Sequence, residues 1–385
     1  MLHLPRQDAE TYEQLVDNVR SFSDDIVRPR AEALDQSSEF PRDIYEKMAE
    51  LGLFGITVPE ELGGAGMDVL SYTLVMEELA RGYASVADQC GVVELIATLL
   101  SQYGTAEQQA RYLPDILAAK TIIAYCITEE EAGSDVAGLR TTSTKGDDGW
   151  VLNGSKLWIH NAPVADLGFV LARTAPEAGH RGMSIFIVDL HAAGVERGPK
   201  EHKLGQRASQ IGALRFTDVK LSEDALLGEL NRGFYIMMSV LEKGRVGIAA
   251  LATGIAQAGL EAALAYAKQR KQFGKAIIDH QGLQWILADM AKDIAAARAL
   301  VREAALKLDN GVPAGMACSI AKCFASDMCV AQTSNAIQVF GGSGYIRGFE
   351  VERLYRDAKI TQIYEGTNQI QRTIIGRELV KNGAR

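Results

Sequence analysis

The spacing of apolar residues changes twice along the 385-residue chain, and these changes constrain the fold more than any other feature. In residues 1–120, apolar residues recur three and four positions apart, which is typical of amphipathic helices. Residues 121–228 contain short alternating runs bounded by Gly, Asn, Asp or Pro, which is typical of strands. The helical spacing returns in residues 229–385. We therefore expect an α+β, mostly α protein with an N-terminal helical domain, a middle β-domain and a C-terminal four-helix bundle at these boundaries.

The middle region contains five β-rich runs, TIIAYCIT, WVLNGSKLWIH, LGFVLART, MSIFIVDL and ALRFTDVKL. Their number and spacing favour a small barrel or sandwich over βαβ units. The dipeptides Asp148-Gly149 and Asn153-Gly154 predict tight turns between strands. In the C-terminal region one apolar stripe predicts the core face of a bundle helix. It consists of Leu283, Ile286, Leu287, Met290, Ile294, Ala297 and Val301.

Composition excludes several classes of protein. The hydrophobic fraction of 47% and charged fraction of 23% are ordinary for a soluble globular protein. A net charge of −9 disfavours a nucleic-acid binder. The odd number of cysteines, five, and the absence of a secretory signal indicate reduced thiols and a cytoplasmic location. The cysteines lack CxxC spacing and the six histidines lack the spacing of a metal site. The N-terminus lacks the pattern of a signal peptide, and no run of about 18 apolar residues predicts a membrane span.

The run IYEGTNQIQR places Glu365 between an aromatic residue and Gly366. Thr367 and Asn368 are residues that often start helices, and apolar residues recur at helical spacing after them. We therefore expect Glu365 on a tight loop that enters a helix. A partly desolvated carboxylate there could act as a general base. From this run alone, a solvated helix cap or a partner of the helix dipole is the more common role.

Three further clusters each allow two interpretations. The sequence contains neither GxGxxG after a strand nor GxxxxGK[ST], but GGSGYIRG (341–348) could present backbone N–H groups to a phosphate or could simply end a helix. The loop in YCITEEEAGSD (125–135) could hydrogen-bond a planar ligand or merely connect strands. Trp158 in KLWIHNAP could flank a flat cofactor or belong to the core.

Taken together and in order, six motifs resemble those of the acyl-CoA dehydrogenase family, in particular its short-chain and branched-chain members. They are YCITEEEAGSD, WIHNAP, QRKQFGKAIIDHQ, QVFGGSGY, LYRDAKI and IYEGTNQIQR, and they extend over essentially the whole chain. The resemblance implies an FAD-dependent dehydrogenase that converts an acyl-CoA thioester to the trans-2-enoyl-CoA. It further implies that Glu365 abstracts the α-proton, that electrons pass to an electron-transfer flavoprotein, and that the protein is a homotetramer. Gly244 stands where the isovaleryl and long-chain branches carry the base.

The resemblance also assigns the residues around the cofactor and the substrate. Those expected to line the flavin are Tyr125, Ile127, Thr128, Gly133, Ser134, Trp158, Ile159 and His160. Those expected at the phosphates and the adenine half are Arg270, Phe273, His280 and Gln281, with Gln338, Val339, Gly341 and Gly342 reaching across a subunit interface. Thr367 and Gln369 would complete the cofactor site. The substrate would contact Ser134, Glu242, Gly244, Arg245 and Gly366.

The chain departs from the family pattern at several positions. Glu130 and Glu131 replace the usual Pro and Gly, and His160 replaces a hydroxyl residue near flavin N5. His160 could donate a hydrogen bond, could alter redox potential or oxygen reactivity, or could merely pack. Glu94 could select a polar acyl group, or it could be solvated or paired. We expect a short or branched acyl chain. The alternatives are an oxygen-reactive or carrier-protein-thioester relative, and a nucleic-acid-associated flavoprotein without turnover.

Overall fold

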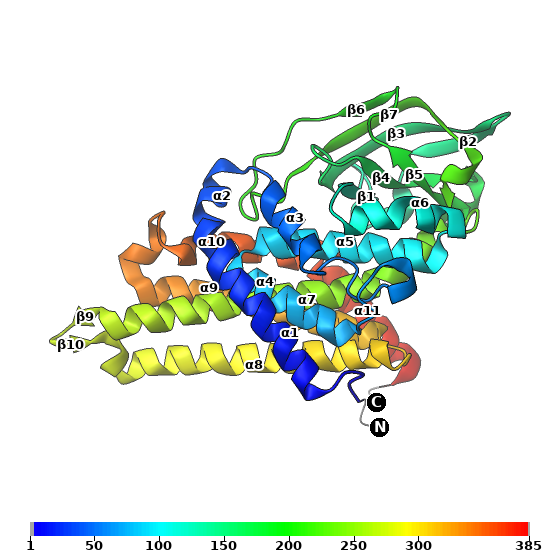
Figure 1. The fold of residues 1–385 in the computed structure, drawn as a ribbon. Coiled ribbons are helices and arrows are strands. Elements are labelled where there is room, and N and C mark those ends of the chain that lie inside the picture. Colours follow the sequence, from blue (N-terminus) through cyan, green and yellow to red (C-terminus); the bar gives the residue numbers. More distant parts are fainter. Residues whose placement is uncertain (1–3, 384–385) are drawn as a thin grey trace.

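The computed structural model describes residues 4–383. The expectation that the N-terminus is not a signal peptide therefore rests partly on residues 1–3, which lie outside the described residues. The chain begins with a layer of helices, continues as a sheet and ends as a bundle of long helices (Figure 1). Asp8 and Thr105 cap two of the first helices by accepting hydrogen bonds from backbone N–H groups, as N-cap residues do. The N-terminal helices are α1 (Ala9–Phe22), α2 (Ala31–Ser37), α3 (Arg42–Glu50), α4 (Val69–Gly82), α5 (Ala84–Tyr103) and α6 (Ala106–Leu117).

The middle region forms one sheet of eight strands in the order β6-β7-β3-β2-β4-β5-β8, with β1 paired to β4. β1 and β4 run parallel, whereas β3 and β7 and also β4 and β5 form long antiparallel pairs. No crossover helix separates these strands, as the spacing of the β-rich runs predicts. The strands are β1 (Ile123–Cys126), β2 (Thr142–Gly146), β3 (Gly149–His160), β4 (Leu167–Arg173), β5 (Met183–Asp189), β6 (Val195–Arg197), β7 (Ile211–Leu221) and β8 (Leu226–Leu227).

The two predicted turns have different outcomes. Gly146 pairs with Gly149 across the hairpin of β2 and β3, so a tight turn is present as predicted, but its two loop residues are Asp147 and Asp148 and Gly149 begins β3. The turn predicted at Asn153-Gly154 is wrong, because this dipeptide lies inside β3, where the pairing with β7 shifts register. Gly154 has a φ of 142°, and a Cβ there would lie 2.6 Å from the Cα of Thr141. The glycine therefore serves a strand irregularity with close backbone approach, not a chain reversal.

The C-terminal region consists of long packed helices. The predicted stripe lies on the buried face of α8, where Leu287, Met290 and Ile294 are all less than 9% exposed, so the predicted core face is confirmed. The sequence did not predict the small hairpin of β9 (Lys271–Gln272) and β10 (Lys275–Ala276) between α7 and α8 (Figure 1). The helices are α7 (Gly233–Gln269), α8 (Gln281–Asp309), α9 (Gly315–Phe340), α10 (Glu350–Lys359) and α11 (Asn368–Asn382).

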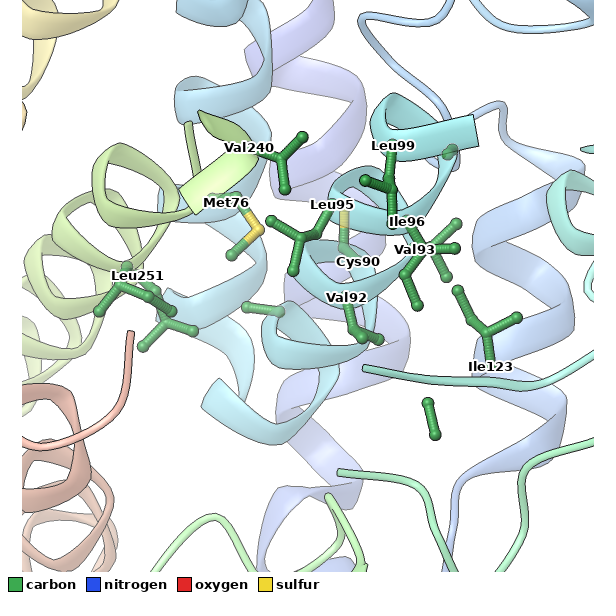
Figure 2. Close-up of a cluster of buried hydrophobic side chains, with 14 of the residues drawn as sticks. Met76, Cys90, Val92, Val93, Leu95, Ile96, Leu99, Ile123, Val240 and Leu251 are labelled. Atoms are coloured by element: carbon green, nitrogen blue, oxygen red, sulfur yellow. The ribbon is translucent and has the colours of Figure 1, made fainter. Parts of the chain in front are cut away.

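One apolar cluster joins the N-terminal helices, the sheet and the bundle. Figure 2 shows side chains of α4, α5, β1 and α7 in it, including Met76, Leu95, Ile123 and Val240. This packing fixes α5 and α7 against β1 and thereby positions the candidate site. Within the described residues, α5 and α7 are long and apolar enough to cross a membrane by length and composition, and 83% and 72% of their most apolar windows are buried inside the fold.

Candidate active site

Glu365 lies on a short turn between α10 and α11, as predicted. Its φ is 55° and that of Gly366 is 88°, so two successive residues occupy the left-handed region. That conformation suits glycine but is uncommon for glutamate, and such backbone strain is concentrated at functional sites. The turn ends at Thr367, whose hydroxyl accepts a hydrogen bond from the N–H of Ile370 at the start of α11, which confirms the predicted helix start.

The side chain of Glu365 lies against α7 at Gly244. A Cβ at position 244 would come within 2.5 Å of Glu365 Oε2, so only glycine leaves this space to the carboxylate. Oε2 is buried and has no hydrogen-bond partner among residues 4–383. Burial raises the pKa of Glu365 to about 7, although the positive charges of Arg245 and Lys322 oppose the shift. The carboxyl group is therefore poised to exchange a proton near neutral pH.

Two buried side chains hold the backbone of this turn. Lys322 of α9 donates to the carbonyl of Gly366 at 2.8 Å and to Asn368 Oδ1 at 3.0 Å. Gln371 Nε2 donates to the carbonyls of Glu365 at 3.2 Å and Gly366 at 2.9 Å. Neither Lys322 nor Gln371 was predicted as a site residue from the sequence. The available signal was a lysine on the apolar face of the alanine-rich helix α9, since buried lysines are rare.

The two strand segments predicted to line the flavin lie side by side. The N–H of Leu157 donates to the carbonyl of Thr128 at 2.9 Å. Trp158 follows at a register shift in β3 with a φ of 54°, and 59% of its surface is exposed, so it does not belong to the core. Tyr125 ties β1 to α7 through a hydrogen bond to the carbonyl of Met237 at 3.0 Å. Among the other predicted residues, Ile127 and Ile159 are buried, and Gly133 and Ser134 are exposed.

His160 belongs to a hydrogen-bonded cluster and is not merely packed. Its Nε2 lies 2.8 Å from Ser209 Oγ, 3.0 Å from Gln89 Nε2 and 3.4 Å from Asp88 Oδ2. Burial lowers the pKa of His160, although the charge of Asp88 opposes this. A neutral imidazole is therefore favoured near neutral pH. Because the charge of Asp88 also raises the pKa of Glu365, His160 and Glu365 share one electrostatic neighbourhood.

Glu94 is paired with Lys243 in the structure, which is one of the roles that the sequence left open. Glu94 is 1% exposed, and its Oε1 lies 3.4 Å from Lys243 Nζ and accepts from the N–H of Thr57 at 3.2 Å. Lys243 also donates to Thr98 Oγ1 at 2.8 Å. This cluster ties α5 to α7 one residue before Gly244.

A single chain does not bring all the predicted cofactor residues together. Arg270, Phe273, His280 and Gln281 lie at the β9–β10 hairpin, where Phe273 is 94% exposed. Since an α-helix rises about 1.5 Å per residue, Arg270 lies roughly 39 Å from Gly244 along α7. Gln338, Val339, Gly341 and Gly342 lie at the end of α9, where Gly341, with a φ of 61°, ends the helix. Within a single chain, GGSG therefore ends a helix, which is one of the two roles that the sequence allowed. Gly341 and Gly342 are both exposed.

The remaining predicted residues flank the turn and α7. Thr367 is half-buried as the cap of α11, whereas Gln369 is exposed. Glu242 is half-buried, and Arg245 is 9% exposed, with no partner for its Nε among residues 4–383. Arg245 thus lies beside Gly244, and its buried Nε–H group has no acceptor in the described part of the chain.

Comparison with known proteins identifies the family. Models of the acyl-CoA dehydrogenase N-terminal, middle and C-terminal domains match residues 9–120, 124–219 and 231–380. The chain belongs to the acyl-CoA dehydrogenase family. It is 45% identical to an acyl-CoA dehydrogenase of Bacillus subtilis over 363 residues, which cover 94% of this chain and 96% of that protein.

Two further relatives carry more specific names. Subunit CarC of the caffeyl-CoA reductase–Etf complex of Acetobacterium woodii is 43% identical over 365 residues, covering 94% of this chain and 96% of that protein. The structure of butyryl-CoA dehydrogenase from Megasphaera elsdenii matches with a TM-score of 0.95 and 39% identity, covering 98% of this chain and 100% of that one. The predicted fold class, with helical, β and helical parts, is confirmed by this likeness.

As a member of this family, the protein is an FAD-dependent oxidoreductase. The arrangement of its residues fits that cofactor. The exposed indole of Trp158 offers an aromatic wall, and the adjoining loop offers backbone groups and open space at Gly133, where an added Cβ would meet no atom within 4 Å. The unpartnered carboxylate of Glu365 and the half-buried imidazole of His160 supply polar groups in the same neighbourhood.

Proposed function

We propose that this acyl-CoA dehydrogenase removes hydrogens from the α- and β-carbons of a short or branched acyl-CoA, with Glu365 as the general base. The observation that carries the proposal is the buried, unpartnered Oε2 of Glu365 on a left-handed turn, set into the space that Gly244 leaves. A buried acceptor without a partner calls for an explanation, and the left-handed turn and the gap at Gly244 point to a group that arrives with the substrate.

The backbone of the same turn supplies a second catalytic contact. Among the described residues the N–H of Glu365 has no hydrogen-bond acceptor, so it is free to bind the thioester oxygen, which gains negative charge as the α-proton leaves. Gly366 carries no side chain that would obstruct the approach. Bound FAD supplies the acceptor for the β-hydride. Glu365 holds the α-proton at its carboxylate, and its raised pKa suits that task.

The electrons then pass to an electron-transfer flavoprotein, in this proposal. Support comes from the relative that is named as a subunit of an Etf complex. We further propose a cytoplasmic homotetramer in which the β9–β10 hairpin and the end of α9 of one subunit contact the FAD of another. The roughly 39 Å between Arg270 and Gly244 supports this, because one cofactor does not reach both places in a single chain.

The test is anaerobic bleaching of the enzyme-bound flavin by a panel of acyl-CoA thioesters. We expect rapid bleaching by short or branched acyl-CoA, slower bleaching by long-chain acyl-CoA, and reoxidation by an electron-transfer flavoprotein. The matched control is Glu365→Gln with its FAD content measured. If the control bleaches as fast as the wild type, Glu365 is not the base.

An oxygen-reactive relative is the second candidate, and His160 is the observation that favours it. Its ring replaces a hydroxyl residue and is held by Ser209 and Gln89 in the neighbourhood of Glu365. Repeating the bleaching experiment in air separates the two functions. A dehydrogenase stays reduced while product is bound, whereas an oxidase reoxidises at once and releases hydrogen peroxide.

A further inference from the structure

Lys322 lies behind the turn that carries Glu365 and projects from another helix, α9. It is 0% exposed, so its ammonium depends on fixed acceptors. These are the carbonyl of Gly366 at 2.8 Å and Asn368 Oδ1 at 3.0 Å. Asn368 is held in turn, because its Nδ2 donates to Asp327 Oδ1 at 2.7 Å. The lysine thus contacts both sides of the turn without a hydrogen bond to the carboxylate itself.

Gln371 makes a comparable contact without a charge. Its Nε2 donates to the same carbonyl of Gly366 at 2.9 Å and to that of Glu365 at 3.2 Å, and the side chain is also 0% exposed. A neutral amide can therefore donate to this carbonyl as an ammonium does. A buried ammonium is costlier than a buried amide, so the use of lysine calls for an electrostatic reason as well.

That reason is the carboxylate of Glu365. Arg245 of α7 and Lys322 of α9 favour its ionised form, whereas Asp88 of α5 disfavours it. Burial lowers the pKa of Lys322 to about 8, against the attraction of Glu365, so most of the ammonium is still charged near pH 7, where Glu365 is half ionised.

The other titratable groups near the pair do not supply this charge. Around Glu365, burial raises the pKa of Tyr72, Tyr125 and Tyr364 and keeps these phenols neutral. Around Lys322, Cys323 and Asp327 of its own helix raise its pKa, while Arg245 lowers it. Lys322 is thus the one cation in this group that also bonds the turn itself.

We propose that Lys322 is a positioning residue for Glu365. Lys322 holds the left-handed turn through Gly366 and Asn368, and its positive charge stabilises the ionised carboxylate of Glu365. This inference rests on the proposed role of Glu365 as the base. Among residues 4–383, Lys322 donates only to Gly366 and Asn368, and it acts through Glu365.

The experiment compares Lys322→Met with Gln371→Leu in the FAD-loaded enzyme. Both variants remove a hydrogen bond to the carbonyl of Gly366, but only the first removes a charge. The readout is the second-order rate constant of anaerobic flavin reduction at low acyl-CoA concentration between about pH 5.5 and 9, because its pH profile reports the pKa of the substrate-free enzyme. We expect the wild-type midpoint near pH 7, a shift upward by about one unit or more in Lys322→Met, and a lower plateau without a shift in Gln371→Leu. Lys322→Arg restores the midpoint because it restores the charge.

A second measurement separates this inference from the proposed function. The infrared carboxyl band that disappears in Glu365→Gln reports the protonation of Glu365 without any turnover. An upward shift of its midpoint in Lys322→Met supports the inference even if no acyl-CoA bleaches the flavin. An unshifted midpoint, or an equal shift in Gln371→Leu, overturns it, and the bleaching of the wild type then still stands as support for the proposed function. If Lys322→Met does not retain FAD, Lys322→Gln carries the same prediction, since its amide can still donate to Gly366.

Discussion

Glu129 and Glu365 are two carboxylates that the fold places near a buried lysine, with opposite consequences. Glu129 Oε1 accepts from Lys156 Nζ at 2.8 Å and from the N–H of Thr141 at 3.0 Å, while its Oε2 accepts from the N–H of Arg140 at 2.5 Å. Oε2 of Glu365 has no partner in the described part of the chain, and Lys322 bonds the backbone beside it instead.

The pKa values follow these contacts. Burial acts to raise the pKa of Glu129, but Lys156 and the backbone donors outweigh burial and hold it below its usual value. Burial dominates at Glu365 and raises its pKa to about 7. The difference teaches that a nearby lysine does not by itself decide the role of a carboxylate. Donors aimed at the oxygens make Glu129 a structural anion, and their absence leaves Glu365 free to take a proton.

The largest effect is expected from Glu365→Gln. The amide cannot accept the α-proton, so the rate constant of flavin reduction should fall by a factor of about 10²–10⁴ or more. FAD content and the melting temperature should not fall, because Oε2 makes no hydrogen bond within residues 4–383. Stopped-flow absorbance measures the rate. A variant that loses FAD together with its activity would mean that Glu365 is structural like Glu129.

Lys156→Met should lower the free energy of unfolding. Lys156 is 1% exposed and donates to Glu129 and to the carbonyl of Ile127, so its removal leaves a buried carboxylate with its main counter-charge gone. Losing one partner of such a pair costs about 3–5 kcal/mol of unfolding free energy. Urea denaturation measures this loss. The control is Lys120→Met, which breaks an exposed pair with Asp115 and should leave stability nearly unchanged.

The same comparison predicts opposite dependences of stability on pH. The folded-state pKa of Glu365 lies above its ordinary value of 4.5, so the folded protein binds the extra proton and loses stability as the pH rises from about 4.5 to about 7. Glu365→Gln should therefore be more stable than the wild type at pH 8, by an amount on the order of 2–3 kcal/mol. The pKa of Glu129 is lowered, so its contribution is present above its unfolded pKa, and Glu129→Gln should be less stable at pH 8. Denaturation curves at about pH 5 and pH 8 check both signs.

The local part of the fold and of the site could be predicted from the sequence. Thr367 caps a helix and the chain turns beside Asp148-Gly149 because the chemistry of each lies within a few residues. Asn153-Gly154 has the same local signature, but the pairing of β3 with β7 overrides it. Strand register depends on distant residues, which a dipeptide does not encode.

The contacts that hold the Glu365 turn could not be predicted for the same reason. Lys322 reaches the turn from 44 residues away, and the residues are brought together only by the packing of α9 against α11. The pairing of Lys243 with Glu94 spans 149 residues. A lysine at a helical core position signals a buried partner, but the sequence does not say which one. The roles of these residues depend on contacts that only the folded chain creates.

The smallest effect is expected from Gly244→Ala, which tests whether the space around Glu365 matters as much as its missing donors. The new Cβ would lie 2.5 Å from Oε2, so the carboxylate must move, but its flexible tip allows this. We expect the rate constant of flavin reduction to fall about ten-fold, which corresponds to ~1.4 kcal/mol of barrier. Stability should rise slightly, because alanine favours a helix interior over glycine. Gly259→Ala is the matched control in α7, since its Cβ would meet its nearest atom at an ordinary 3.5 Å. Equal rates in the two variants would show that Glu365 does not depend on the gap at Gly244.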